Sequence, residues 1–193
     1  MTPFQTLVSG KDVFVLGSAP SASLDARPPG ARVIASNGSL IPFPNLVPDI
    51  LVVNNFTARG GSQVARLSLR GLAGRSARHL VAVTGLQPFD TVLASLASAG
   101  LAWDSAEELT IEARNSIVEI ALGRPLQGAI GDNTASTGVT ALAWAHQSGA
   151  ASLTLSGISL KGNHSYIDRP TVRKHADIDA EILARLGIVL SED

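Results

Sequence analysis

Short apolar runs recur along the chain, and each ends in small or polar residues. Most are almost continuously apolar, which is typical of parallel strands covered on both faces. These runs predict strands at 12–17, 31–36, 49–55, 79–85, 152–157 and 187–190. Patterns with helical spacing lie at 59–74, 89–101, 105–122, 137–148 and 174–186. The alternation predicts an α/β fold: a single Rossmann-like domain over residues 1–193, with a mostly parallel sheet and helices on both faces.

The loop after the first predicted strand combines small residues with hydroxyl groups. Ligands of open α/β sheets bind beyond the carboxyl ends of the strands, so this loop should face any site. Small side chains let an anion approach backbone N–H groups. The sequence is neither G-x-G-x-x-G nor a Walker loop, so a plain turn explains it equally well. The candidate nucleotide-binding residues here are Gly17, Ser18, Ala19, Pro20 and Ser21.

Two later strands end in asparagine, and a predicted helix begins with hydroxyl groups. Asn37 precedes a glycine, which is a turn signal in itself, and Asn54 could cap a helix. Together the two amides suit ribose hydroxyls and a base edge. Ser136, Thr137 and Gly138 open the helix at 137–148. This group attracts an anion more strongly than capping alone requires.

Composition narrows the classes of function. The chain has 193 residues, a formal net charge of −1 and no cysteine. Disulfides, thiolate metal sites and thiol catalysis are therefore excluded, and broad nucleic-acid binding is disfavoured. The sequence shows no signal peptide, no apolar run of about 18 residues that would cross a membrane, and no H-E-x-x-H or D-x-D metal motif. We expect a cytoplasmic protein without a metal site, and homo-oligomerisation stays open.

Six short motifs occur in an order that resembles a known family. They are "GSAPSASL", "VIASN", "LVVN", "STGV", "LSGIS" and "KHADIDAEILARLGI". The set is similar to bacterial sialyltransferases that transfer sialic acid from CMP-sialic acid to lipooligosaccharide. It is also similar to the wider group of motility-associated factors and hydroxymethylpterin diphosphokinases. The resemblance touches most of the chain.

The resemblance implies a glycosyltransferase that uses a CMP-activated sugar and a glycan acceptor, without a metal or other cofactor. His175 would be the general base of a single displacement, and Tyr166 would steady the leaving phosphate. Segment 161–174 would be a lid over the substrate, with Lys161 and His164 as weaker contacts. The residues expected to bind the nucleotide are Ser18, Asn37, Asn54, Ser136, Thr137 and Gly138, together with Gly17, Ala19, Pro20, Ser21 and Gly157.

Several positions depart from the family pattern and keep two alternatives open. Ser18 and Ala19 replace an amide and a glycine, Ser159 replaces an aspartate, and Lys161 replaces a tyrosine. One alternative is a diphosphokinase-like enzyme that uses ATP and Mg²⁺. The other is a degenerate nucleotide-binding domain without catalysis. Carboxylates available to Mg²⁺ near predicted loops are Asp49, Asp132 and Asp168.

The remaining histidines and tryptophans have simpler interpretations. His79 opens a predicted strand and His146 lies late in a predicted helix, so both are read as structural. Trp103 and Trp144 are read as packing residues. His175 itself lies in the first turn of a helix whose apolar face repeats every four residues, and a surface histidine in a helix cap is its alternative reading.

Overall fold

A six-stranded parallel sheet forms the centre of the molecule. The computed structural model describes residues 1–85, 87–127, 134–161, 164–166 and 174–190. Every strand pair in the sheet is parallel, in the order β5-β4-β3-β2-β1-β6. The strands are β1 Asp12–Leu16, β2 Arg32–Ser36, β3 Ile50–Asn54, β4 Ser76–Thr84, β5 Ala102–Thr110 and β6 Ser152–Ser156. The predicted α/β, Rossmann-like class is confirmed.

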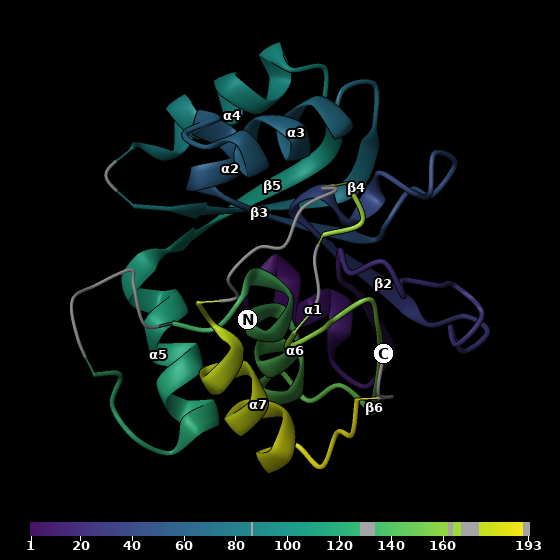
Figure 1. Ribbon diagram of the computed structural model, residues 1–193, viewed down its shortest axis with the longest axis vertical. Helices are drawn as coiled ribbons and strands as arrows, with labels where there is room; N and C mark the ends of the chain where they lie inside the picture. The colour runs from purple at the N-terminus through teal and green to yellow at the C-terminus, as the bar shows by residue number, and fades with distance from the viewer. Residues whose placement is uncertain (86, 128–133, 162–163, 167–173, 191–193) are drawn as a thin grey trace.

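Helices cover both faces of this sheet (Figure 1). From β1 to β5 the chain steps across the sheet in one direction, and right-handed crossovers place α2, α3 and α4 on one face. It then returns to β6 in the opposite direction, which places α5 and α6 on the other face with α1 and α7. The helices are α1 Pro3–Val8, α2 Asn55–Arg59, α3 Gln63–Gly71, α4 Phe89–Ser98, α5 Ile111–Leu122, α6 Thr137–Gln147 and α7 Ala176–Arg185, with a 3₁₀ turn, η1, at Asn37–Leu40.

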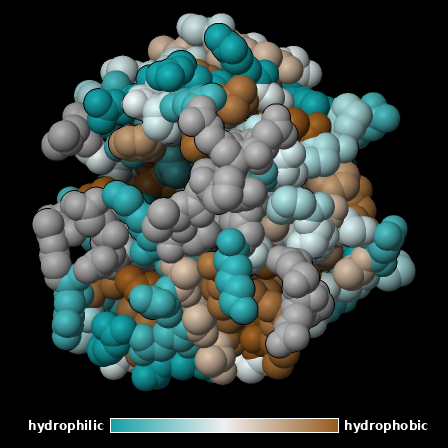
Figure 2. All heavy atoms as spheres, viewed as in Figure 1, coloured by the Kyte–Doolittle hydropathy of each residue, from teal (hydrophilic) through white to brown (hydrophobic). Residues whose placement is uncertain are grey.

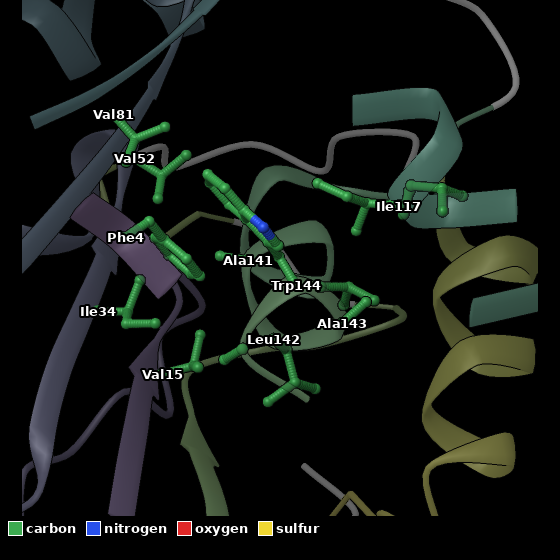
Figure 3. Packing of buried hydrophobic residues seen from close by; sticks show 14 of the residues in the cluster. Phe4, Val15, Ile34, Val52, Val81, Ile117, Ala141, Leu142, Ala143 and Trp144 are labelled. Carbon is green, nitrogen blue, oxygen red and sulfur yellow. The ribbon is translucent and has the colours of Figure 1, made fainter. Parts of the chain in front are cut away.

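The larger hydrophobic core lies between the sheet and α6, and nine consecutive residues of α6 are buried. A helix this apolar has no solvent face of its own, because it is enclosed by the sheet and its neighbouring helices. The ring of Trp144 stacks on that of Phe4, with 3.7 Å between the ring centroids and 3° between the planes (Figure 3). This contact docks α1, which the sequence did not predict, and it confirms Trp144 as a packing residue.

Two predicted elements are wrong. The helix predicted at 105–122 is strand β5 followed by α5, because 102–110 pairs in register with β4 along one edge of the sheet. The strand predicted at 187–190 does not form. The N–H of Ile188 donates to the carbonyl of Leu183 at 2.9 Å, so the segment begins by closing α7. The helix predicted at 59–74 is the shorter α3, and it is preceded by α2, which was not predicted and which ends at Gly60 with a φ of 59°.

The strand order reverses at one place, between β1 and β6. β2, the strand that follows β1 in the chain, lies on one side of β1, whereas β6 lies on the other side. The loops that leave the carboxyl ends of β1 and β6 therefore run in different directions. The crevice at such a point is the usual ligand site of an open α/β sheet. The visible face is hollowed between the layer of α2–α4 and the layer of α5–α7 (Figure 2). Within the described ranges, no helix combines the length and apolarity needed to cross a membrane.

Candidate functional site

An amide and hydroxyl cluster joins the carboxyl ends of β2 and β3 to the start of α6. The Oγ1 atom of Thr137 accepts from Nδ2 of Asn37 at 3.1 Å and from Nδ2 of Asn54 at 3.2 Å. Three predicted nucleotide-binding residues therefore meet at one oxygen. A hydroxyl offers two lone pairs and one O–H. Because the amides use both lone pairs, the O–H of Thr137 is the donor that this arrangement presents at the helix N-terminus.

The two asparagines are held by each other and by α2. Asn37 has a φ of 47°, a left-handed conformation that asparagine tolerates better than most residues. Its Oδ1 accepts from the backbone N–H of Asn54 at 3.0 Å and from the hydroxyl of Thr57 at 3.2 Å. Oδ1 of Asn54 caps α2 by accepting from the N–H of Thr57 at 2.8 Å. Thr57 was not singled out from the sequence, although it stands at the third position of a helix capped by Asn54.

The ends of β1 and β6 touch through two glycines. The N–H of Gly17 donates to the carbonyl of Ser156, and that of Ala19 donates to the carbonyl of Gly157, both at 2.8 Å. A Cβ on Gly17 would lie 2.2 Å from the carbonyl oxygen of Gly157. Two of the N–H groups in the small-residue loop therefore join the ends of β1 and β6.

The far end of that loop turns away from the amide cluster. Pro20 and Ser21 are both exposed. Ser21 lines a hollow of about 430 Å³ that runs along β6 and residues 187–190. Among the described strands, β6 pairs with β1 alone, so this hollow follows an edge of the sheet. Ser21 therefore shares this hollow with Gly157, whereas Asn37, Asn54 and Thr137 do not line it.

Residues 164–166 of the candidate lid dock on the carboxyl edge. His164 Nδ1 and Ser18 Oγ share a hydrogen bond of 2.6 Å, and the N–H of Ser165 donates to the carbonyl of Ser18 at 2.7 Å. The rings of His164 and Tyr166 stack, with centroids 5.2 Å apart. Tyr166 also covers Gly38, where a Cβ would lie 2.7 Å from the tyrosine ring. His164 therefore lies at the end of β1, and Tyr166 lies beside η1 at the end of β2.

The rest of the candidate lid is less informative. Lys161 is exposed, and its N–H donates to the hydroxyl of Ser159 at 3.2 Å. Residues 162–163 and 167–173 lie outside the described residues.

His175 lies directly before α7 and points to the segment that leads into α6. Its Nδ1 is 2.6 Å from the carbonyl oxygen of Thr134. A carbonyl can only accept, so Nδ1 carries the hydrogen, and the neutral ring has its lone pair on Nε2. This is the tautomer in which Nε2 can act as a general base. The predicted base is therefore anchored next to the predicted nucleotide-binding helix.

Two buried charged residues complete this region, and neither was predicted as part of the site. Arg114 is 9% exposed, and its Nη2 donates to the carbonyl of Ala135 at 2.5 Å. Burial lowers the pKa of Arg114 to about 10, and the negative charge of Asp179 opposes that shift. Oδ1 of Asp179 accepts from the N–H of Ser136 at 2.8 Å. Arg114 could have been suspected because it lies on the face of α5 that also buries Ile117.

Of the carboxylates named for the Mg²⁺ alternative, Asp49 lies away from this site. Asp49 precedes β3, at the amino end of the sheet, and forms ion pairs with Arg32 at 2.9 Å and Arg78 at 3.3 Å. Asp132 and Asp168 lie outside the described residues. Among the residues that are described, no group of three His, Asp or Glu side chains is arranged to hold a metal ion.

The histidines read as structural lie away from the amide cluster. His79 is buried in β4, with its Nδ1 2.8 Å from the hydroxyl of Ser105. His146 is exposed near the end of α6, opposite to the end that carries Thr137.

Comparison of this chain with protein-family models, with curated protein sequences and with solved structures gave no match.

Proposed function

We propose that the protein is a glycosyltransferase-like enzyme that transfers sialic acid or a related sugar from a CMP-activated donor to a glycan acceptor. The reaction is a metal-independent single displacement with His175 as the base. One observation carries the proposal: Nδ1 of His175 lies 2.6 Å from the carbonyl oxygen of Thr134, just before the N-terminus of α6, which supports Nε2 as the nitrogen that would act as the base.

The start of α6 supports binding of the phosphate. A helix N-terminus carries a partial positive charge and directs N–H groups outward, which favours an anion. Thr137 adds an O–H donor there because its lone pairs are occupied by two amides. Gly138 is closely packed, since a Cβ on it would lie 3.2 Å from Cδ1 of Ile158 and 3.4 Å from the hydroxyl of Ser36. In this proposal the phosphate of CMP binds at the start of α6.

The proposed chemistry needs one proton acceptor and one leaving group. The acceptor hydroxyl oxygen forms a bond to the anomeric carbon while the bond from that carbon to the phosphate oxygen of CMP breaks. Nε2 of His175 takes the hydroxyl proton, and CMP leaves with the bonding electron pair on its phosphate. The hydroxyl of Tyr166 donates a hydrogen bond to that phosphate in this proposal. His175 therefore assists the nucleophile, and Tyr166 assists the leaving group.

Nucleotide binding is the first test. Calorimetry with CMP, UDP and ATP, each with and without Mg²⁺, should give binding of CMP that does not depend on the metal. Binding of ATP only with Mg²⁺ would favour the diphosphokinase alternative. The absence of any heat with CMP would contradict the proposal.

Turnover is the second test, with two histidine variants compared. His175→Ala should lower transfer or hydrolysis of a CMP-sugar about 10²- to 10⁴-fold, the usual contribution of a general base. His146→Ala is the matched control, because His146 is exposed near the C-terminal end of α6. Equal turnover in the two variants would rule out His175 as the base. CMP binding without turnover in the parent protein would favour the degenerate domain.

A further inference from the structure

Three consecutive residues before α6 are each held by a side chain from another helix or its cap. We call Thr134–Ser136 the clamped turn. The Thr134 carbonyl accepts from His175, the Ala135 carbonyl accepts from Arg114, and the Ser136 N–H donates to Asp179. The three bonds measure 2.6, 2.5 and 2.8 Å. Side chains from α5, from α7 and from the cap of α7 therefore form hydrogen bonds with the same short stretch of backbone.

The clamp buries two charged side chains, which lose their contact with water at a cost in free energy. Arg114 is buried, and within the described part of the chain its Nε has no hydrogen-bond partner. Asp179 is buried as well, and its charge attracts the guanidinium. Buried charge pairs often contribute less stability than apolar residues of similar size would. A gain in stability is thus a weak explanation for burying Arg114 and Asp179 here. A role in fixing the geometry of the clamped turn explains the pair better.

The clamp also couples the proposed base to the proposed phosphate cradle. Asp179 lies four residues after His175, and its N–H donates to the carbonyl of His175 at 2.8 Å. The carboxylate and the imidazole therefore reach the clamped turn from one rigid helical turn. Ser136 caps α6, since its hydroxyl accepts from the N–H of Val139 at 3.4 Å. If the clamped turn shifted, the Thr134 carbonyl that holds the imidazole of His175 and the start of α6 would move together.

We propose that Arg114 and Asp179 are positioning residues, which fix the clamped turn so that the Thr134 carbonyl holds His175 in its Nδ1–H tautomer. The catalytic meaning of this role rests on the function proposed above. Neither residue needs to touch the substrate, because each acts through the backbone of the turn. Loss of the clamp releases the imidazole to both tautomers and misplaces Nε2 relative to α6.

The tautomer can be read directly, without any substrate. Protein labelled with ¹⁵N-histidine is measured at about pH 8, where imidazoles are neutral. The parent should show His175 with a protonated Nδ1, and His175→Ala assigns the signals. Arg114→Met and Asp179→Ala should lose this signature and show mixed tautomers. The signals of His164, which bonds Ser18 instead, serve as the internal reference.

Conservative and double variants keep the test decisive. Arg114→Lys can still donate to Ala135 and Asp179→Asn can still accept from Ser136, so both should largely retain the signature. The double variant Arg114→Met/Asp179→Asn leaves no unpaired charge and should fold, yet it should lose the signature. A folded double variant that keeps the parent tautomer would overturn the proposal.

Kinetics then separates this proposal from the proposed function. If the protein is a transferase, the double variant should lower kcat about 100-fold, as expected for misplaced reacting groups. CMP affinity should change much less. If no turnover exists in the parent, the function proposed above fails, while the tautomer experiment still decides the positioning role. If kcat and the tautomer both stay at parent values, the clamp serves only to hold α5, α6 and α7 together.

Discussion

Replacing Thr137 by valine removes one hydroxyl oxygen and keeps the shape of the side chain. That oxygen accepts from Nδ2 of Asn37 and of Asn54, so two amide N–H groups lose their partner. The Oδ1 atoms of both asparagines keep their bonds, to the N–H of Asn54 and to Thr57. The substitution therefore breaks the link to α6 and leaves the rest of the cluster intact.

The expected loss follows from the two hydrogen bonds. Each contributes about 0.5–1.5 kcal/mol net, and an unsatisfied buried donor adds to the loss. Asn37 and Asn54 are half-buried, so water replaces part of what is lost. We expect Thr137→Val to lower the free energy of unfolding by about 2 kcal/mol. For a chain of this size that is a fall in Tm of about 4–8 °C.

Thr140→Val is the matched control in the same helix. Thr140 is 2% exposed, and its hydroxyl has no hydrogen-bond partner within the described residues. Valine there removes a buried polar group that gains nothing, so stability should stay the same or rise by up to about 1 kcal/mol. Both variants place valine in α6, so helix propensity cancels in the comparison.

Urea and thermal unfolding followed by circular dichroism measure both variants. Equal losses at the two positions would refute the claim that the Thr137 hydroxyl is a hydrogen-bonding centre. The same pair tests the site by calorimetry: Thr137→Val should weaken CMP binding about 10-fold or more, roughly the loss of a hydrogen bond to a charged group, and Thr140→Val should not. A stability loss without a binding loss would make the cluster purely structural.

Three further substitutions test the packing that supports the site, one of them as a control. Gly17→Ala should destabilise by about 3 kcal/mol or more, because its Cβ would lie 2.2 Å from the carbonyl oxygen of Gly157. Gly30→Ala meets open space at a φ of 76° and should cost only about 1–2 kcal/mol of backbone strain; a larger loss at Gly30 would contradict this. Phe4→Ala should cost about 3–5 kcal/mol, since Phe4 is fully buried against Trp144. A Phe4→Ala protein with the urea midpoint of the parent would show that α1 does not contribute to the core.

The interior of the sheet could be predicted because both of its faces are buried. The inner strands are almost wholly apolar, and such runs are distinctive in a sequence. β5 lies at an edge and contains Asp104, Glu107 and Glu108 in a half-exposed stretch. Alanine, glutamate and leucine there favour a helix locally, and pairing with β4 overrides that preference. A local sequence pattern does not show which distant strand a segment will pair with.

The location of the site could be predicted for a similar reason. Parallel strands end at one edge, so polar residues after several strands must gather there, and Asn37, Asn54 and Thr137 do so. The clamp could not be predicted, because its partners at Thr134 and Ala135 are backbone carbonyls, which every residue has. The roles of the site residues, and the nucleotide itself, stay predictions until binding is measured.

The position of β1 has a consequence for how the protein folds during synthesis. Asp12 of β1 and Ser152 of β6 are bonded across 140 residues of sequence. A ribosome therefore releases β1 to β5 well before the strand that covers the remaining edge of β1. Until β6 emerges, an apolar strand shows one unpaired edge, which is the usual starting point of misassociation between nascent chains. Contacts so distant in sequence also slow folding.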